Sequence, residues 1–236
     1  MDRRFASLAN LANFANRVPQ GRRISFAQVA VLIAAAILNL GPIQSVSAAT
    51  DPAQVATLRA IASAFPSSNS FFNAWSGDDP CAASSGWPGV SCENNGTGSR
   101  VVTSLTLQGL GLSGQLPPAL FELTTLTALD ISLNQGLTGS IYSTIGSLSS
   151  LAMLDMHGCS LSGPIPATIG LVKKLSFFAV SSNKLSGSIP RQVANLTNLY
   201  FLDITDNQIS GPVPVQPGFD TCTNIAHLCV PLLVVR

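Results

Sequence analysis

One unit of 24 or 25 residues recurs five times in this chain, and this repeat limits the possible folds more than any other feature of the sequence. The units begin at Val102, Leu126, Leu151, Leu175 and Leu199, which gives steps of 24, 25, 24 and 24 residues. A unit of this length cannot bury its apolar residues alone, whereas stacked units share one continuous core. The repeat therefore predicts a solenoid built from residues 102–214.

Apolar and polar residues alternate at the start of every unit. The apolar residues at the fourth and sixth places are Leu105 and Leu107, Leu129 and Ile131, Leu154 and Met156, Phe178 and Val180, and Leu202 and Ile204. Successive side chains of a strand point to opposite faces, so this pattern predicts one short strand per unit with one buried face. Stacked units then place these strands in a parallel β-sheet that lines a concave surface.

An asparagine follows the strand at one fixed offset in three of the units. These residues are Asn134, Asn183 and Asn207. An inward amide at this turn can satisfy backbone groups that would otherwise be buried without partners, so we interpret the asparagines as a structural ladder. Leu110 and Cys159 interrupt the ladder in the first and third units, and the 25-residue step arises from one extra residue in 134–137.

The first 48 residues differ from the rest of the chain. Five arginines precede an apolar run from Ala27 to Leu40, and Val46–Ala48 provides the small residues that a signal peptidase requires. The run has about 14 residues, against roughly 20 that span a bilayer. The sequence therefore predicts a signal peptide at 1–48, with a membrane anchor as the alternative. The mature chain would be secreted to the apoplast or cell surface without a membrane span.

Cleavage would leave seven basic and ten acidic residues, a net charge of −3, which excludes an electrostatic footprint for nucleic acid or anionic membranes. Secretion permits disulfides, and we expect Cys81 and Cys92, which lie close together before the repeats, to be paired. Cys159 is interpreted as a small buried residue. Cys222 and Cys229 lie in an apolar tail at 215–236, either a truncated sixth repeat or an irregular cap.

Further motifs accompany the repeat. A Gly-x-Ile/Leu/Val-Pro sequence follows the turn in four units, at 114–117, 163–166, 187–190 and 211–214, and Tyr142 replaces the proline in the second unit. Before the repeats, Asp51–Gln54 has the pattern of a helix N-cap, a first-turn proline and a capping-box partner. Trp75, Asp79–Cys81 and Trp87–Cys92 follow.

With these motifs, residues 51–214 resemble the plant-specific class of leucine-rich repeats found in receptor-like kinase ectodomains, receptor-like proteins and polygalacturonase-inhibiting proteins. The resemblance implies an α/β leucine-rich-repeat solenoid. Its features would be a right-handed stack of coils, a concave parallel β-sheet, short 3-10 or irregular convex segments, and an N-terminal helical disulfide cap at 49–101.

Segments 134–139, 157–163 and 217–220 resemble more closely a receptor-like kinase subfamily that includes a hydrogen-peroxide sensor. Those receptors continue with further repeats, a membrane helix and a kinase domain, and these 236 residues contain none of them. The sequence therefore predicts an ectodomain truncated before the membrane helix and kinase, and it supports neither a kinase nor a peroxide-sensing role.

The outward side chains of the predicted sheet are the candidate contact surface. Met153, Phe177 and Phe201 would form a contiguous apolar stripe, and such a patch commonly marks a binding site. Asp155, Asp203 and His157 would orient a bound partner. Two alternatives are that the family tolerates apolar residues at these positions, or that a missing sixth repeat covers them.

The sequence predicts an extracellular recognition module of receptor-like type, whose partner is a protein or peptide, including a co-receptor ectodomain. The alternatives are an inhibitor of a cell-wall-degrading enzyme and a nonfunctional receptor-kinase fragment. We expect no enzyme, because no nucleophile elbow or phosphate-binding loop is present and His157 and Cys159 face opposite sides. No cofactor or metal site is expected. Asn95 and Asn195 lie in glycosylation acceptor motifs.

Overall fold

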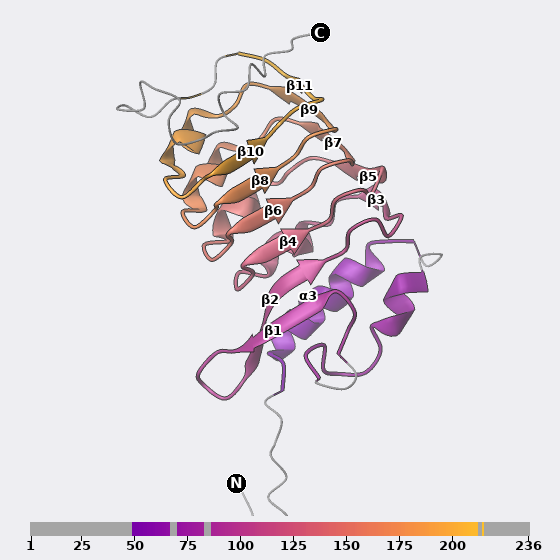
Figure 1. The fold of residues 1–236 in the computed structure, drawn as a ribbon. Coiled ribbons are helices and arrows are strands. Elements are labelled where there is room, and N and C mark those ends of the chain that lie inside the picture. The colour runs from indigo at the N-terminus through magenta and orange to yellow at the C-terminus, as the bar shows by residue number, and fades with distance from the viewer. Residues whose placement is uncertain (1–48, 67–69, 83–85, 212–213, 215–236) are drawn as a thin grey trace, which may run out of the picture. The chain divides into compact units, whose positions relative to one another are not determined.

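The computed structural model describes residues 49–66, 70–82, 86–211 and 214 (Figure 1). The predicted signal peptide at 1–48 and the tail at 215–236, with Cys222 and Cys229, lie outside the described residues. Within the described residues, one α-helix precedes a regular series of short strands and 3-10 helices.

The cap contains helix α3 (Pro52–Ser63) and the 3-10 helix η1 (Ser70–Ala74). The side chain of Asp51 accepts a hydrogen bond from the amide of Ala53 and so caps helix α3. Leu58 and Ile61 of this helix are fully buried. The predicted N-cap and first-turn proline are therefore confirmed.

Gln54 has a different role from the capping-box partner that the sequence predicts. The Asp51 amide donates to the carbonyl of Arg100 (3.0 Å), so it needs no side-chain acceptor. The side chain of Gln54 instead accepts from the Val102 amide (2.7 Å) and donates to the Thr125 hydroxyl (2.6 Å). Gln54 thus joins helix α3 to the first coil of the solenoid.

A disulfide closes the cap, and an antiparallel strand pair connects the cap to the repeats. Cys81 and Cys92 form the expected disulfide, with their Cα atoms 5.7 Å apart. Strand β1 (Val90–Asn94) pairs antiparallel with β2 (Arg100–Thr106), the strand of the first repeat. The cap therefore covers one edge strand of the repeat sheet.

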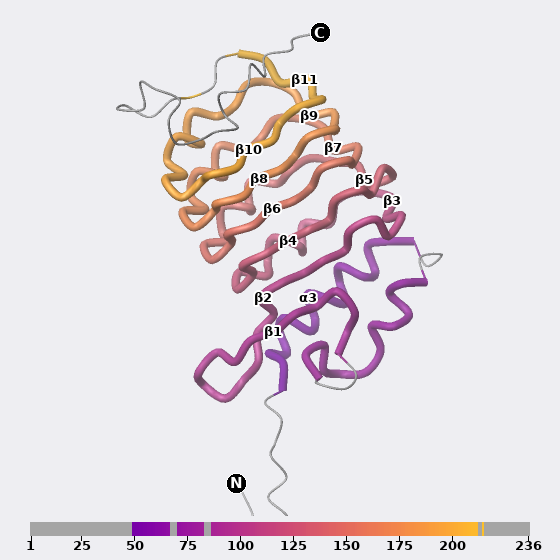
Figure 2. The backbone as a smooth tube through the Cα atoms, viewed as in Figure 1, coloured from indigo at the N-terminus to yellow at the C-terminus, as the bar shows by residue number. Residues whose placement is uncertain are grey.

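Each of the five repeats contributes one strand to a six-stranded sheet of order β1-β2-β4-β6-β8-β10. The neighbours from β2 onward are parallel, which confirms the predicted sheet. Beyond the cap and β2, its strands are β4 (Ala128–Asp130), β6 (Met153–Asp155), β8 (Phe177–Ala179) and β10 (Phe201–Asp203). Successive turns of the backbone lie one above the other (Figure 2).

The turns form a second parallel sheet, of order β11-β9-β7-β5-β3, which the sequence analysis does not predict. Its strands are β3 (Ser113–Gln115), β5 (Gly136–Gly139), β7 (Ser160–Gly163), β9 (Lys184–Gly187) and β11 (Gln208–Ile209). The coils are completed by the 3-10 helices η2 (Pro118–Glu122), η3 (Ser143–Ser147), η4 (Ala167–Leu171) and η5 (Arg191–Asn195).

The core lies inside the coils, where the fourth and sixth places of each unit point. In the first four units these side chains are 0% exposed, and in the last unit Leu202 is 6% exposed and Ile204 is half-buried. The predicted inward face is therefore confirmed. Because each buried residue packs against adjoining coils, the stability of the stack comes mainly from interfaces between coils.

The asparagine ladder is structural, as predicted. The side-chain amide of Asn183 donates to the carbonyls of Met156, Val180 and Ser181 at 2.8–3.1 Å, and its oxygen accepts from the Leu161 amide at 2.9 Å. Asn134 and Asn207 make the corresponding bonds, each within its own coil and to the preceding coil. Each ladder amide thus satisfies its own turn and a backbone amide of the preceding coil.

The second turn departs from this pattern, and its two irregularities are linked. Cys159 replaces the asparagine of the third coil and offers no amide oxygen to Leu137, the corresponding residue of the second coil. The extra residue in the second turn lets the Leu137 amide donate to the carbonyl of Asn134 instead (2.9 Å). The Cys159 thiol donates weakly to the Ile131 carbonyl (3.4 Å).

Candidate binding surface

The strand register places the predicted apolar stripe in one row. Met153 pairs with Phe177, and Phe177 pairs with Phe201, so the three side chains project from neighbouring parallel strands. They point outward because the strand residues that follow them, such as Phe178 and Leu202, point into the core. Met153 is 36% exposed, and the two phenylalanines are half-buried.

The two phenylalanine rings form a stacked pair on this outward face. Their centroids are 4.4 Å apart and their planes differ by 5°. Stacking holds each ring in place, so the pair presents a preordered apolar surface with a small entropic cost on binding. A rigid aromatic pair of this kind has the character of a binding anchor.

Asp130, Asp155 and Asp203 form a column beside the apolar stripe, and each is the last residue of its strand. Each carboxylate accepts a hydrogen bond from the backbone amide two residues further along the chain. The Asp130 carboxylate accepts from the amide and hydroxyl of Ser132, and the Asp203 carboxylate accepts the same two bonds from Thr205. Asp155 accepts from the amide of His157 (3.1 Å) and lies 2.7 Å from its ring nitrogen Nδ1. These carboxylates are therefore fixed in position on the sheet face.

Opposing effects act on the pKa of the Asp203 carboxyl. Partial burial raises the pKa, but hydrogen bonds from the Thr205 and Ser181 hydroxyls and from the Thr205 amide lower it, as does the nearby His157. The lowering effects prevail, so the pKa lies below its usual value. Asp203 therefore stays negatively charged into the acidic range.

Cys159 lies inside the solenoid, on the opposite side of the sheet from His157. The thiol residue is 7% exposed, and burial raises its pKa to about 11. A thiol with this pKa is protonated at neutral pH and is a poor nucleophile. The structure thus separates the two residues as the alternating pattern predicts.

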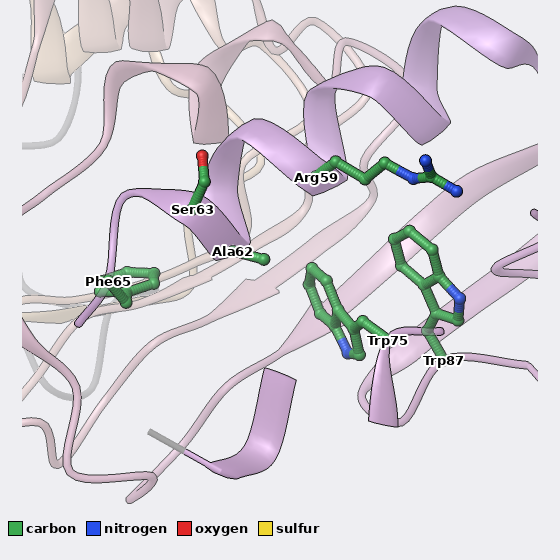
Figure 3. A pocket seen from close by; sticks show the side chains of 6 residues that line it. All are labelled: Arg59, Ala62, Ser63, Phe65, Trp75 and Trp87. Carbon is green, nitrogen blue, oxygen red and sulfur yellow. The ribbon is translucent and has the colours of Figure 1, made fainter. Parts of the chain in front are cut away.

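The cap contains a pocket that the sequence does not predict (Figure 3). It has a volume of about 420 Å³ and is lined by Arg59, Ala62, Ser63, Phe65, Trp75 and Trp87. The indole rings of Trp75 and Trp87 stack with centroids 5.2 Å apart, and these residues are only 8% and 1% exposed. The pocket floor is therefore part of the cap core.

The two predicted glycosylation acceptors both lie on the surface. Asn95 and Asn195 are exposed, and the Asn95 side chain accepts hydrogen bonds from the Thr97 amide and hydroxyl at 2.9 and 2.7 Å. Glycan attachment stays a prediction at both residues.

No helix in residues 49–66, 70–82 and 86–211 is long and apolar enough to cross a bilayer. The same residues contain no group of three or more His, Cys, Asp or Glu side chains that could hold a metal ion.

Comparison with known proteins gives matches in the cap and in the repeats. A model of the leucine-rich-repeat N-terminal domain matches residues 51–93, and a model of the leucine-rich repeat matches residues 150–171. The chain is 30% identical to the BIR2 ectodomain of Arabidopsis thaliana, with 71% of this chain and 85% of that chain covered and a TM-score of 0.62.

Two further structures are solved as complexes. A chain of the Arabidopsis BIR3–SERK2 complex is 36% identical, with coverage of 68% and 85% and a TM-score of 0.59. The Arabidopsis HAESA ectodomain, solved with an IDA peptide hormone ligand, is 27% identical, with coverage of 69% and 31% and a TM-score of 0.51. The chain spans 7%, 26% and 12% of the first curated plant relatives that it matches.

Proposed function

We propose that this chain, which belongs to the plant leucine-rich-repeat family, is an extracellular recognition module that binds a protein or peptide through the outward face of its six-stranded sheet. One observation carries the proposal. The stacked Phe177–Phe201 pair and Met153 form an apolar row on a sheet face that also carries fixed carboxylates. Interfaces of this kind combine aromatic anchors with a polar rim.

The relatives support recognition rather than catalysis. HAESA is solved with a peptide hormone and BIR3 with SERK2, so similar ectodomains bind peptides or other ectodomains. Since the chain covers only a small share of its curated relatives, their kinase activity is not assigned to it. Secretion is part of the proposal, with residues 1–48 as the leader.

The phenylalanine pair provides the test. The wild-type protein would be used to select binders from a random-peptide display library and from a panel of plant receptor ectodomains. The double variant Phe177→Asp/Phe201→Asp should bind the selected partners at least about 30-fold more weakly, because loss of the anchor pair removes roughly 2 kcal/mol or more of binding free energy. Affinity would be measured by biolayer interferometry, and folding by far-ultraviolet circular dichroism.

Leu171 offers a matched control, since it is an exposed apolar residue (60%) on helix η4 rather than on the sheet. Leu171→Asp should leave the affinity unchanged. Equal binding by the folded double variant and the wild type would refute the sheet face as the site, as would an equal loss in Leu171→Asp.

A further inference from the structure

One column of the sheet face gives its side-chain hydrogens to the neighbouring column of aspartates. The Ser132 hydroxyl donates to Asp130 and the Thr205 hydroxyl donates to Asp203, each at 2.7 Å. The Ser181 hydroxyl also bonds to Asp203 and contributes to its low pKa. A hydroxyl has one hydrogen and two lone pairs, so these groups have only acceptor capacity left.

The third coil carries His157 in this column, in place of a hydroxyl. Its ring nitrogen Nδ1 lies 2.7 Å from Asp155 Oδ1, which also accepts from the His157 backbone amide at 3.1 Å. A carboxylate only accepts, so we assign the ring hydrogen to Nδ1. The neutral ring has one N–H, which leaves Nε2 with a lone pair. Asp155 therefore fixes the tautomer in which Nε2 is an acceptor.

The Nε2 atom is available to a bound partner. The Asp155 side chain is 12% exposed and the His157 side chain is 32% exposed, so the ring reaches solvent while its contact with the carboxylate is shielded. Among the described residues, the side-chain hydrogen bonding of His157 is confined to Nδ1. His157 shares the outward face with Met153, because Leu154 and Met156 between them point into the core. The apolar row and Nε2 therefore lie on one continuous surface.

Groups from neighbouring coils face His157. They are Asp130 on the β4 side, Ser181 on the β8 side and Asp203 on β10, whose pKa His157 helps to lower, while Cys159 lies on the interior side. The low pKa of Asp203 and the pKa of about 11 of Cys159 keep each of these groups in one protonation state between about pH 5 and 8. Histidine is the side chain that ordinarily changes its charge in this range.

We propose that His157 is the pH-sensitive contact of the sheet face, and that its Nε2 accepts a hydrogen bond from an N–H or O–H group of the bound protein or peptide. The partner presents a donor here, since the neighbouring hydroxyls and carboxylates are acceptors. Acid adds a proton at Nε2, because Nδ1 already carries one. Two donors then face each other and the hydrogen bond is lost, so acidification weakens binding. This inference rests on the proposed function and adds regulation by pH to it.

The tautomer is testable in the protein alone. In a long-range nitrogen–hydrogen correlation spectrum at about pH 8, Nδ1 of His157 should give the signal of a protonated ring nitrogen and Nε2 that of an unprotonated one. Acidification to about pH 5 should convert the Nε2 signal to the protonated type with little change at Nδ1. The chain has two histidines, and the spectrum of His157→Ser identifies the signals of His157. A hydrogen on Nε2 at the higher pH would overturn the proposal.

The binding test uses a peptide selected on the wild-type protein at about pH 7.5. Wild-type affinity should fall by about tenfold between about pH 7.5 and 5.5, because one hydrogen bond is lost and two donors oppose each other. His157→Ser gives the third coil the hydroxyl that Ser132 provides in the second, so it keeps a donor to Asp155 without a titrating ring. Any titration of the peptide itself affects both proteins equally, so the variant should not show the additional loss.

The outcomes separate this inference from the proposed function. If binding is lost in Phe177→Asp/Phe201→Asp but the wild type and His157→Ser respond equally to pH, the pH-sensitive contact is refuted and the sheet-face function stands. If binding is indifferent to the phenylalanine pair, the proposed function fails and this inference fails with it. Circular dichroism of each variant at both pH values shows whether a lost interaction reflects a lost fold.

Discussion

The second and fourth turns of the solenoid solve the same hydrogen-bonding problem in different ways. In the fourth turn, the Leu185 amide donates to the side chain of Asn207 in the next coil. In the second turn, the next coil offers Cys159, and the Leu137 amide donates to the carbonyl of Asn134 within its own turn. Both arrangements satisfy a backbone amide next to the core.

The difference shows that two irregularities of the repeat compensate for each other. With the extra residue in the second turn, the Asn134 carbonyl accepts the hydrogen bond that the side-chain oxygen of an asparagine at position 159 would otherwise accept. The Cys159 thiol donates to the Ile131 carbonyl, as the side-chain amide of that asparagine would. A change that looks like a defect in one coil is therefore matched in its neighbour. Stability in such stacks depends on contacts between adjoining coils, so the compensation has to occur across one interface.

The largest effect should come from removing one irregularity without the other. Deletion of Gln135 restores the regular spacing but leaves the Leu137 amide without an acceptor, and Cys159→Asn introduces an amide oxygen without a donor. Each change should cost about 2 kcal/mol of unfolding free energy, since it leaves a buried polar group unpaired. Urea denaturation monitored by circular dichroism measures the loss.

The combination of these two changes sharpens the comparison. Together they rebuild the arrangement of the fourth turn, so the double variant should recover most of the lost stability, with a coupling energy of about 3 kcal/mol. Additive losses in the double variant would show that the two irregularities are independent. As a matched control, Cys159→Asn combined with deletion of Ser182, outside the second turn, should give no recovery.

An effect of similar size concerns pH, because the Cys159 thiol titrates and the asparagine side chain at the same position of other coils does not. Burial raises the folded-state pKa of Cys159 from 9.0 to about 11. The contribution of the protonated thiol to the free energy of unfolding is therefore fully present below pH 9 and is lost as the pH rises through 11. The stability difference between wild type and Cys159→Ala should fall by about 2 to 3 kcal/mol over this range. The difference between wild type and Asn207→Ala should not change, and a parallel change in both would contradict the assignment.

The smallest effect concerns backbone conformation at the start of each turn. Leu133 in the second turn and Asp206 in the last have positive φ angles of 58° and 51°. Aspartate tolerates this conformation better than leucine. Leu133→Gly should therefore stabilise the protein by about 0.5 kcal/mol, and Asp206→Gly should have almost no effect. Thermal unfolding would show the ranking, and destabilisation by Leu133→Gly would contradict it.

The features that the sequence predicts well are the ones that recur in every unit. The inward leucines, the parallel register and the asparagine ladder each follow from a residue type repeated at one position. The apolar row of Met153, Phe177 and Phe201 was predictable for the same reason, because register in a repeat follows from counting residues. The Cys81–Cys92 disulfide was predictable because the two cysteines lie close together in a chain for which the sequence predicts secretion.

The features that the sequence did not reveal depend on contacts between distant segments. The second sheet forms from Ser- and Gly-rich turns whose strands are held by neighbouring coils, so no local apolar alternation marks them. In a capping box the Gln54 side chain would accept from the Asp51 amide, but that amide donates to the Arg100 carbonyl. The Gln54 side chain instead accepts from the amide of Val102, 48 residues away in the sequence.

The direction of the asparagine ladder has a consequence for how such a gene can change. The side-chain oxygen of each ladder asparagine accepts a hydrogen bond from a backbone amide of the preceding coil. A whole coil can therefore be duplicated or lost only if each coil is still followed by one that carries the asparagine it needs. The third coil lacks the asparagine, and the second coil does not need it because its Leu137 amide is paired within its own turn. The two coils are therefore compatible with each other as a pair. Unequal recombination can therefore copy the fourth coil singly, whereas the second and third must be inherited together.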